Sequence, residues 1–110
     1  MPSPLIANLE KLLGTPRDGA LLRYSLGTEY LKAGEAARAI EYLREAVARE
    51  PQYSAAWKVL GRALAGAGRG DEAHAAFTAG IAAARAKGDK QAEKEMAVFA
   101  RRLEKKGGAA

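Results

Sequence analysis

A pattern of small and apolar residues recurs along the chain with a period of 34 residues, and this period constrains the fold more than any other feature. The matching positions are Leu26-Gly27 with Leu60-Gly61, Ala33-Gly34 with Ala67-Gly68, and Ala39 with Ala73. A period of roughly 20 to 50 residues is the signature of supersecondary units that stack on one another. Residues 20–53 and 54–87 are therefore predicted to be two copies of one unit.

Each copy is predicted to fold into two helices. In the first copy the apolar residues follow helical spacing at Leu22, Leu26 and Tyr30, then at Ala36, Ile40, Leu43 and Val47. Gly34 and Gly68 stand where the first helix of each copy should end, because glycine adopts the left-handed closing conformation at little cost. Gly61 lies inside a predicted helix, where glycine costs about 1 kcal/mol relative to alanine. That cost predicts a close helix crossing, with Gly61 facing Ala73.

These residues resemble the tetratricopeptide repeat (TPR), whose pattern is W-x2-L-G-x2-Y, then A-x3-F, then A, then P. The first copy presents Arg23, Leu26, Gly27, Tyr30, Ala39, Leu43, Ala46 and Pro51, and the second presents Trp57, Leu60, Gly61, Leu64, Ala73, Phe77 and Gly80. Departures from the pattern are Arg23 for tryptophan, Leu64 for tyrosine and Arg85 for proline. The resemblance implies an all-α fold, a right-handed stack of antiparallel helical hairpins with about six helices.

Both flanks of the two copies are predicted to cap this stack. Residues 3–14 should form an N-terminal capping helix, with Ser3 as its N-cap and Pro4 at the first helical position. Residues 89–106 resemble the solvating helix that ends TPR arrays. The predicted helices are 4–13, 19–33, 36–49, 53–67, 71–86 and 89–106, in one domain over residues 1–106, with residues 107–110 as a disordered tail.

Further N-caps and a shift of register are predicted in the second half of the chain. Ser54, Asp71 and Asp89 are side chains that can cap the helices that start near them. A strict period would place charged residues at the Leu-Gly positions of the last helix. A two-residue insertion near residues 84–88 removes that conflict and brings Met96 to the leucine position.

Composition argues against most enzyme chemistries and against a membrane protein. The chain has 110 residues, no cysteine and one histidine, His74, and it lacks the common phosphate-binding, zinc-protease and nucleophile motifs. We therefore assign no catalytic, cofactor-binding or metal-binding residues, and an enzyme is the least supported reading. The longest uncharged stretch, residues 73–84, is shorter than the roughly 18 to 20 residues that span a bilayer. Without a recognisable secretory signal, a cytoplasmic location is expected.

A possible ligand surface follows from the resemblance, because the first helix of each TPR pair lines a concave groove. The positions carried over as a peptide-binding groove are Leu21, Tyr24, Thr28, Leu31, Lys32, Lys58, Arg62, Lys94, Arg101 and Arg102. Six of these are cations and none is an acid, so the groove should attract an acidic segment of a partner protein. The carboxylate clamp of some TPR domains is not reproduced, since Thr28 and Arg62 stand where asparagine is expected.

Three interpretations other than the binding of an acidic segment stay open. The net charge of +5 is concentrated in residues 85–110, where eight Lys and Arg face four Asp and Glu, and these cations can simply be solvated. The basic last helix can bind nucleic acid or another polyanion, although most aromatic residues are assigned to the core and few remain to stack on bases. Self-association as a scaffold is the third, because about three repeats are usually needed for stability.

Overall fold

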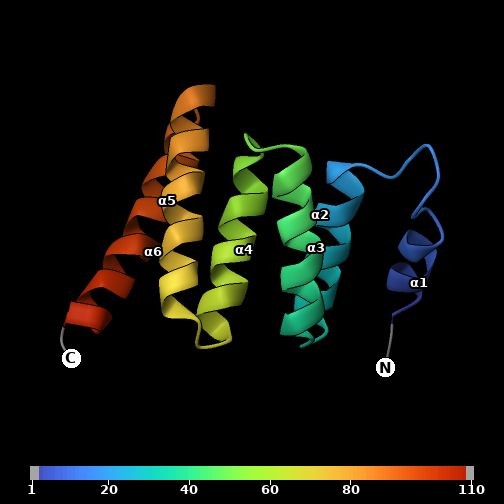
Figure 1. Ribbon diagram of the computed structural model, residues 1–110, viewed down its shortest axis with the longest axis horizontal. Helices are drawn as coiled ribbons and strands as arrows, with labels where there is room; N and C mark the ends of the chain where they lie inside the picture. Colours follow the sequence, from blue (N-terminus) through green and yellow to red (C-terminus); the bar gives the residue numbers. More distant parts are fainter. Residues whose placement is uncertain (1–2, 109–110) are drawn as a thin grey trace.

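Six α-helices form the part of the chain that the computed structural model describes, residues 3–108 (Figure 1). They are α1 (Pro4–Glu10), α2 (Ala20–Lys32), α3 (Ala36–Arg49), α4 (Ser54–Gly66), α5 (Gly70–Lys87) and α6 (Lys90–Gly108). The predicted all-α class and the number of helices are confirmed. The helix α6 includes the first two residues of the predicted 107–110 tail, and residues 109–110 lie outside the described part.

The helices follow one another along the long axis of an elongated molecule, from α1 at one end to α5 and α6 at the other (Figure 1). The principal extents are 44 × 32 × 19 Å. Helices adjacent in the chain pack together, and α4 also contacts both α2 and α6. The first helices of successive pairs therefore adjoin one another on one side of the stack. None of the six helices described is both long enough and apolar enough to cross a bilayer.

A continuous apolar core runs through all six helices. Its fully buried large side chains are Ile6, Leu26, Leu43, Leu60, Leu64, Phe77 and Met96. Met96 has no exposed surface, which agrees with its assignment to the leucine position of the last helix. Leu64 is equally buried, so leucine fills the tyrosine position of the second copy without loss of packing.

Glycines inside α2 and α4 create the close crossings that their positions predict. A Cβ atom on Gly27 would stand 2.5 Å from Leu43 Cγ, and one on Gly61 would stand 2.5 Å from the nearest Phe77 ring carbon. The atoms nearest to such a Cβ on Gly61 thus belong to the ring of Phe77, four residues further along α5 than Ala73, and the predicted contact of Gly61 with Ala73 stays a prediction. Gly34 and Gly68 have φ angles of 82° and 77°, as expected of residues that close α2 and α4.

Two of the four predicted N-caps are confirmed. The Ser3 hydroxyl accepts a hydrogen bond from the Ile6 amide at 3.1 Å, and Asp89 Oδ1 accepts one from the Ala92 amide at 3.1 Å. Ser54 and Asp71 are not N-caps, because α4 begins one residue earlier, and α5 two residues earlier, than a cap there would require. Asp71 lies instead in the first turn of α5, where its negative charge meets the positive end of the helix dipole.

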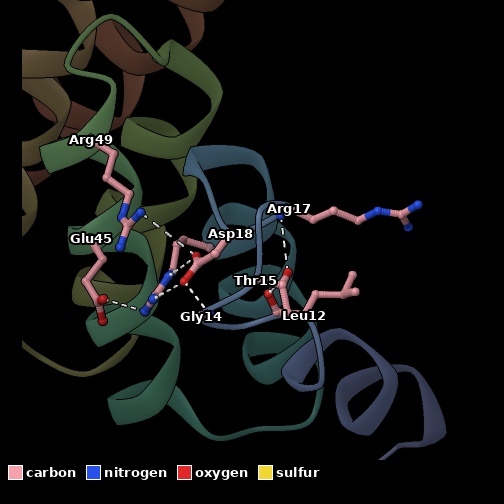
Figure 2. Close-up of polar contacts among 8 residues, drawn as sticks. Leu12, Gly14, Thr15, Arg17, Asp18, Glu45 and Arg49 are labelled. Atoms are coloured by element: carbon pink, nitrogen blue, oxygen red, sulfur yellow. Dashed lines mark hydrogen bonds and ion pairs between the residues drawn. The ribbon is translucent and has the colours of Figure 1, made fainter.

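The first helix is shorter than predicted and leads into an ordered loop. After Glu10 the backbone continues in turns closed by i to i+3 hydrogen bonds, and Gly14 reverses its direction with a φ of 77°. The Asp18 carboxylate then accepts from the Gly14 amide at 2.9 Å and from Arg23 Nη2 at 2.8 Å (Figure 2). The hydrogen bond from Arg23, followed by that from Gly14, lowers the pKa of the Asp18 carboxyl to about 2.

The arginine that replaces tryptophan in the first copy has a structural role. Arg23 bonds to Asp18 on one side and forms an ion pair with Glu45 of α3 on the other (Figure 2). The guanidinium carbon of Arg23 also lies 5.8 Å from the centre of the Tyr42 ring. Arg23 therefore joins the α1–α2 loop, α2 and α3, whereas Trp57, at the equivalent position of the second copy, donates its indole N–H to the Pro51 carbonyl oxygen at 2.7 Å.

Candidate functional site

The candidate surface is formed by α2, α4 and α6, the first helices of successive pairs. We call it the α2/α4/α6 face and define it by the exposed and half-buried side chains Tyr24, Thr28, Leu31, Tyr53, Lys58, Arg62, Glu95, Phe99 and Arg102. Six of these are positions predicted from the sequence, and Tyr53, Glu95 and Phe99 are not. The face divides into an aromatic part, a neutralised ion pair and an arginine cluster.

The aromatic part lies where α2 approaches the start of α4. The rings of Tyr24 and Tyr53 are 5.0 Å apart between their centres, with an angle of 37° between their planes. Burial raises the pKa of the Tyr53 phenol, so the hydroxyl is neutral over the physiological range. Thr28 donates its hydroxyl to the Tyr24 carbonyl oxygen at 2.9 Å, and Leu31 packs partly against the core. This part of the face can take apolar or aromatic groups.

The ion pair joins α4 to α6. Lys58 Nζ lies 3.5 Å from Glu95 Oε1, and the lysine side chain is only 27% exposed. A shallow pocket of about 250 Å³ opens beside them, and Asp89 and Glu95 both line it. Lys58 therefore faces an acid that the carried-over positions did not include, and the positive charge of this part of the face is largely balanced.

The arginine cluster lies further along both helices, with Arg62 one turn beyond Lys58 on α4 and Arg102 two turns beyond Glu95 on α6. The guanidinium carbons of Arg62 and Arg102 lie 5.9 and 5.7 Å from the centre of the Phe99 ring. Phe99 itself stacks on the buried Phe77 at 5.3 Å. Within the described part of the chain, neither arginine forms an ion pair with a carboxylate. This is where the face carries unbalanced positive charge.

Four predicted positions lie outside this arrangement. Leu21 is 68% exposed and lines a small apolar pocket with residues of the α1–α2 segment. Lys32 is exposed and pairs with Glu29 of its own helix at 3.2 Å. Lys94 and Arg101 are exposed, and helical spacing places them on the side of α6 opposite Met96. The six predicted cations therefore do not form one cluster.

Sequence reasoning missed three side chains of this face, and only two of them had a signal in the sequence. Glu95, Phe99 and Arg102 are spaced by four and three residues, as neighbours on one helix surface are, so Glu95 and Phe99 could have been found with Arg102. Tyr53 precedes α4 and belongs to no helical pattern. Its contact with Tyr24 depends on how two repeats pack, which no local spacing reveals.

Comparison with known proteins identifies close relatives of the whole chain. A family model described as tetratricopeptide repeat matches residues 30–93. The TPR repeat-containing protein PA0015 of Pseudomonas aeruginosa is 50% identical over 101 residues, which are 92% of this chain and 96% of that protein. The solution structure of protein BPP2914 from Bordetella parapertussis is 40% identical with a TM-score of 0.80, and the match covers 96% of this chain and 91% of that one. A tetratricopeptide repeat domain protein from Salinibacter ruber is 30% identical with a TM-score of 0.73, over 81% of this chain and 89% of that one.

Proposed function

The chain belongs to the tetratricopeptide repeat family, and on that premise we propose that it is a non-catalytic module that binds an acidic segment of a partner protein on its α2/α4/α6 face. Repeats of this family generally serve as protein-interaction modules. Fold alone does not identify a ligand, so the proposal rests on the chemistry of the face.

One observation carries the proposal. The face carries an aromatic part, Tyr24 with Tyr53, and, beyond the Lys58–Glu95 ion pair, two arginines whose charge is not balanced by acids of the described chain. A segment with an apolar residue followed by acidic residues would cover the tyrosines and neutralise the arginines. Charge-assisted hydrogen bonds from guanidinium groups are about twice as strong as neutral ones, and they fix the orientation of the bound segment.

The two parts of the face would contribute differently to binding. Apolar contact with Tyr24 and Leu31 would supply affinity at about 25 cal/mol for each Å² of apolar surface removed from water. The arginines would accelerate association and select acidic partners. Because exposed charges are screened over about 8 to 10 Å at moderate ionic strength, capture of the partner should weaken as salt is added.

Capture of partners from the native lysate tests the proposal. The Lys58→Glu/Arg62→Glu variant should lose partners that the unchanged protein retains, at a cost on the order of 2–4 kcal/mol in binding. Arg38→Glu/Arg44→Glu is the matched control, because it makes the same change of charge on α3, a second helix of a pair. Unchanged capture by the first variant, together with loss in the control, would overturn the proposal. The cytoplasmic location remains a prediction, which cell fractionation tests.

Polyanion binding is the second candidate, and one observation favours it. Lys94, Arg101 and Lys105 are all exposed, and their spacing places them on one side of α6. Charge reversal of these three residues should abolish retention on immobilised DNA if this candidate is correct. Retention that depends on Arg62 instead would place polyanion binding on the α2/α4/α6 face.

A further inference from the structure

Within the proposed binding face, on which this inference rests, we propose that Arg62 and Arg102 together form the site for one doubly negative group of the partner. The group is a phosphomonoester or a pair of neighbouring carboxylates, both of which present several oxygens to two guanidinium groups. Phe99 is the platform that holds the two arginines in place.

The platform is rigid because of what lies behind it. Phe77 is fully buried and stacks on Phe99, with 5.3 Å between the ring centres and 14° between the ring planes. Phe77 thus packs against the Phe99 ring from the core side. The two arginines come from different helices, α4 and α6, and both lie within 6 Å of the ring centre. Such contacts attract a cation to the ring and restrict its side chain before any ligand binds.

The positive charges of Arg62 and Arg102, both near the Phe99 ring, repel each other, and an anion close to both would offset that repulsion. The described residues supply no carboxylate in ion-pair contact with either arginine. A ligand with one negative charge would leave a net positive charge, whereas a ligand with two would balance the pair. Guanidinium groups also suit carboxylate and phosphate oxygens geometrically, since each can donate two parallel hydrogen bonds.

The neighbouring turn of the same helices provides an internal contrast. There, α4 presents Lys58 and α6 presents Glu95, and the two side chains lie 3.5 Å apart. One turn further, α4 presents Arg62 and α6 presents Phe99, and one more turn along α6 stands Arg102. The chain therefore balances the first cation with its own carboxylate and leaves the next two for a ligand, which directs the anion to the arginines.

Short peptides test the arginine site directly. The full chain is titrated with three synthetic peptides, Gly-Gly-X-Gly-Gly, in which X is phosphoserine, Asp-Asp or serine, while NMR follows the Nε–Hε signals of the arginines. Phosphoserine or Asp-Asp should shift the signals of both Arg62 and Arg102, and the serine peptide should shift neither. Arg62→Gln and Arg102→Gln should each weaken binding about tenfold, whereas Arg101→Gln, on the same helix, should change it less than about twofold.

The outcomes separate this inference from the function on which it rests. Binding of the phosphoserine peptide alone, or of Asp-Asp alone, supports the site and identifies the group it takes. Backbone amide signals of the whole chain are followed in the same titrations, and shifts confined to Tyr24 and Lys58 would overturn the arginine site while the binding face stands. Shifts confined to Lys94, Arg101 and Lys105 would also overturn the arginine site, and so would the absence of shifts with all three peptides. In either case the capture experiment with the Lys58→Glu/Arg62→Glu variant tests the proposed function separately.

Discussion

Phe77 lies so close to Gly61 that a Cβ atom on residue 61 would stand within 2.7 Å of three of its ring carbons. This contact sets the distance between α4 and α5. It also fixes the ring on which Phe99 of α6 stacks, and Phe99 in turn lies beneath Arg62 and Arg102. A glycine inside one helix therefore determines where the arginines of the binding face stand.

Gly61→Ala should destabilise the protein although alanine favours helices. The gain in helix propensity is at most about 1 kcal/mol, and forcing a methyl group into a well-packed core costs about 1–3 kcal/mol. Phe77 has little freedom to move, because it is buried and stacked on Phe99. The midpoint of thermal unfolding, followed by circular dichroism, should fall by several degrees.

Gly66→Ala is the matched control for this prediction. Gly66 also lies in α4, but a Cβ atom there would meet nothing within 4 Å. Its substitution should leave the midpoint unchanged or raise it, since only the gain in propensity remains. Equal changes of the midpoint in the two variants would show that the crossing with Phe77 is not tight.

Met96→Ala should loosen α6 from the stack. Met96 is fully buried, and its sulfur is the atom nearest to where a Cβ atom of Gly80 would stand. Removal of a buried methionine side chain costs roughly 2–5 kcal/mol. Val98→Ala, at a 45% exposed position of the same helix, should cost less than about 0.5 kcal/mol. Urea unfolding monitored by Trp57 fluorescence compares the two, and similar midpoints would mean that α6 is not part of the core.

Asp18→Asn should destabilise the protein most above pH 4. The pKa of Asp18 falls from an ordinary 3.8 to about 2 in the folded state, so its contribution is complete above the unfolded value. That contribution is lost as the pH falls from about 4 toward 2, where the carboxylate of the folded protein also takes up a proton. Thermal unfolding of the two proteins should therefore converge in acid. Glu41→Gln, an exposed change on α3, should follow the unchanged protein, and a pH-independent gap for Asp18→Asn would contradict the prediction.

Glu95→Gln should strengthen binding of acidic peptides, the opposite of the Arg62 and Arg102 substitutions. The change frees Lys58 from its ion pair and removes a negative charge from the edge of the face. Exposed pairs of this kind are worth about 0.2–1 kcal/mol, so an increase of roughly twofold to fivefold is expected by calorimetry. The exchange Lys58→Glu/Glu95→Lys should leave affinity close to its original value. Weaker binding by Glu95→Gln would mean that this part of the face does not contact the ligand.

The fold could be predicted because its determinants are local and repeat. The 34-residue period, the helical spacing of Leu22, Leu26 and Tyr30, and the glycines at the helix ends all indicate paired helices. Helix starts were less predictable. Ser54 and Asp71 are good capping residues by type, yet α4 starts one residue earlier, and α5 two residues earlier, than such caps would require.

The candidate site was only partly predictable, for a physical reason. Helix periodicity assigns Tyr24, Lys58 and Arg62 to one side of their helices, but it does not indicate which charges meet across helices. The pairing of Lys58 with Glu95 and the meeting of two arginines at Phe99 depend on the packing of α4 against α6. That packing depends on Phe77 seated against Gly61, a contact between residues of different helices.

Site-specific photo-crosslinking in cells tests most directly whether the α2/α4/α6 face is the binding surface. A photoreactive amino acid replaces Ala65, exposed on α4 one turn from Arg62, or Ala75, exposed on α5. If this face binds the partner, protein adducts form from position 65 and disappear when Arg62→Glu is added, and few adducts form from position 75. Adducts from position 75 alone, unaffected by Arg62→Glu, would contradict this assignment of the binding surface.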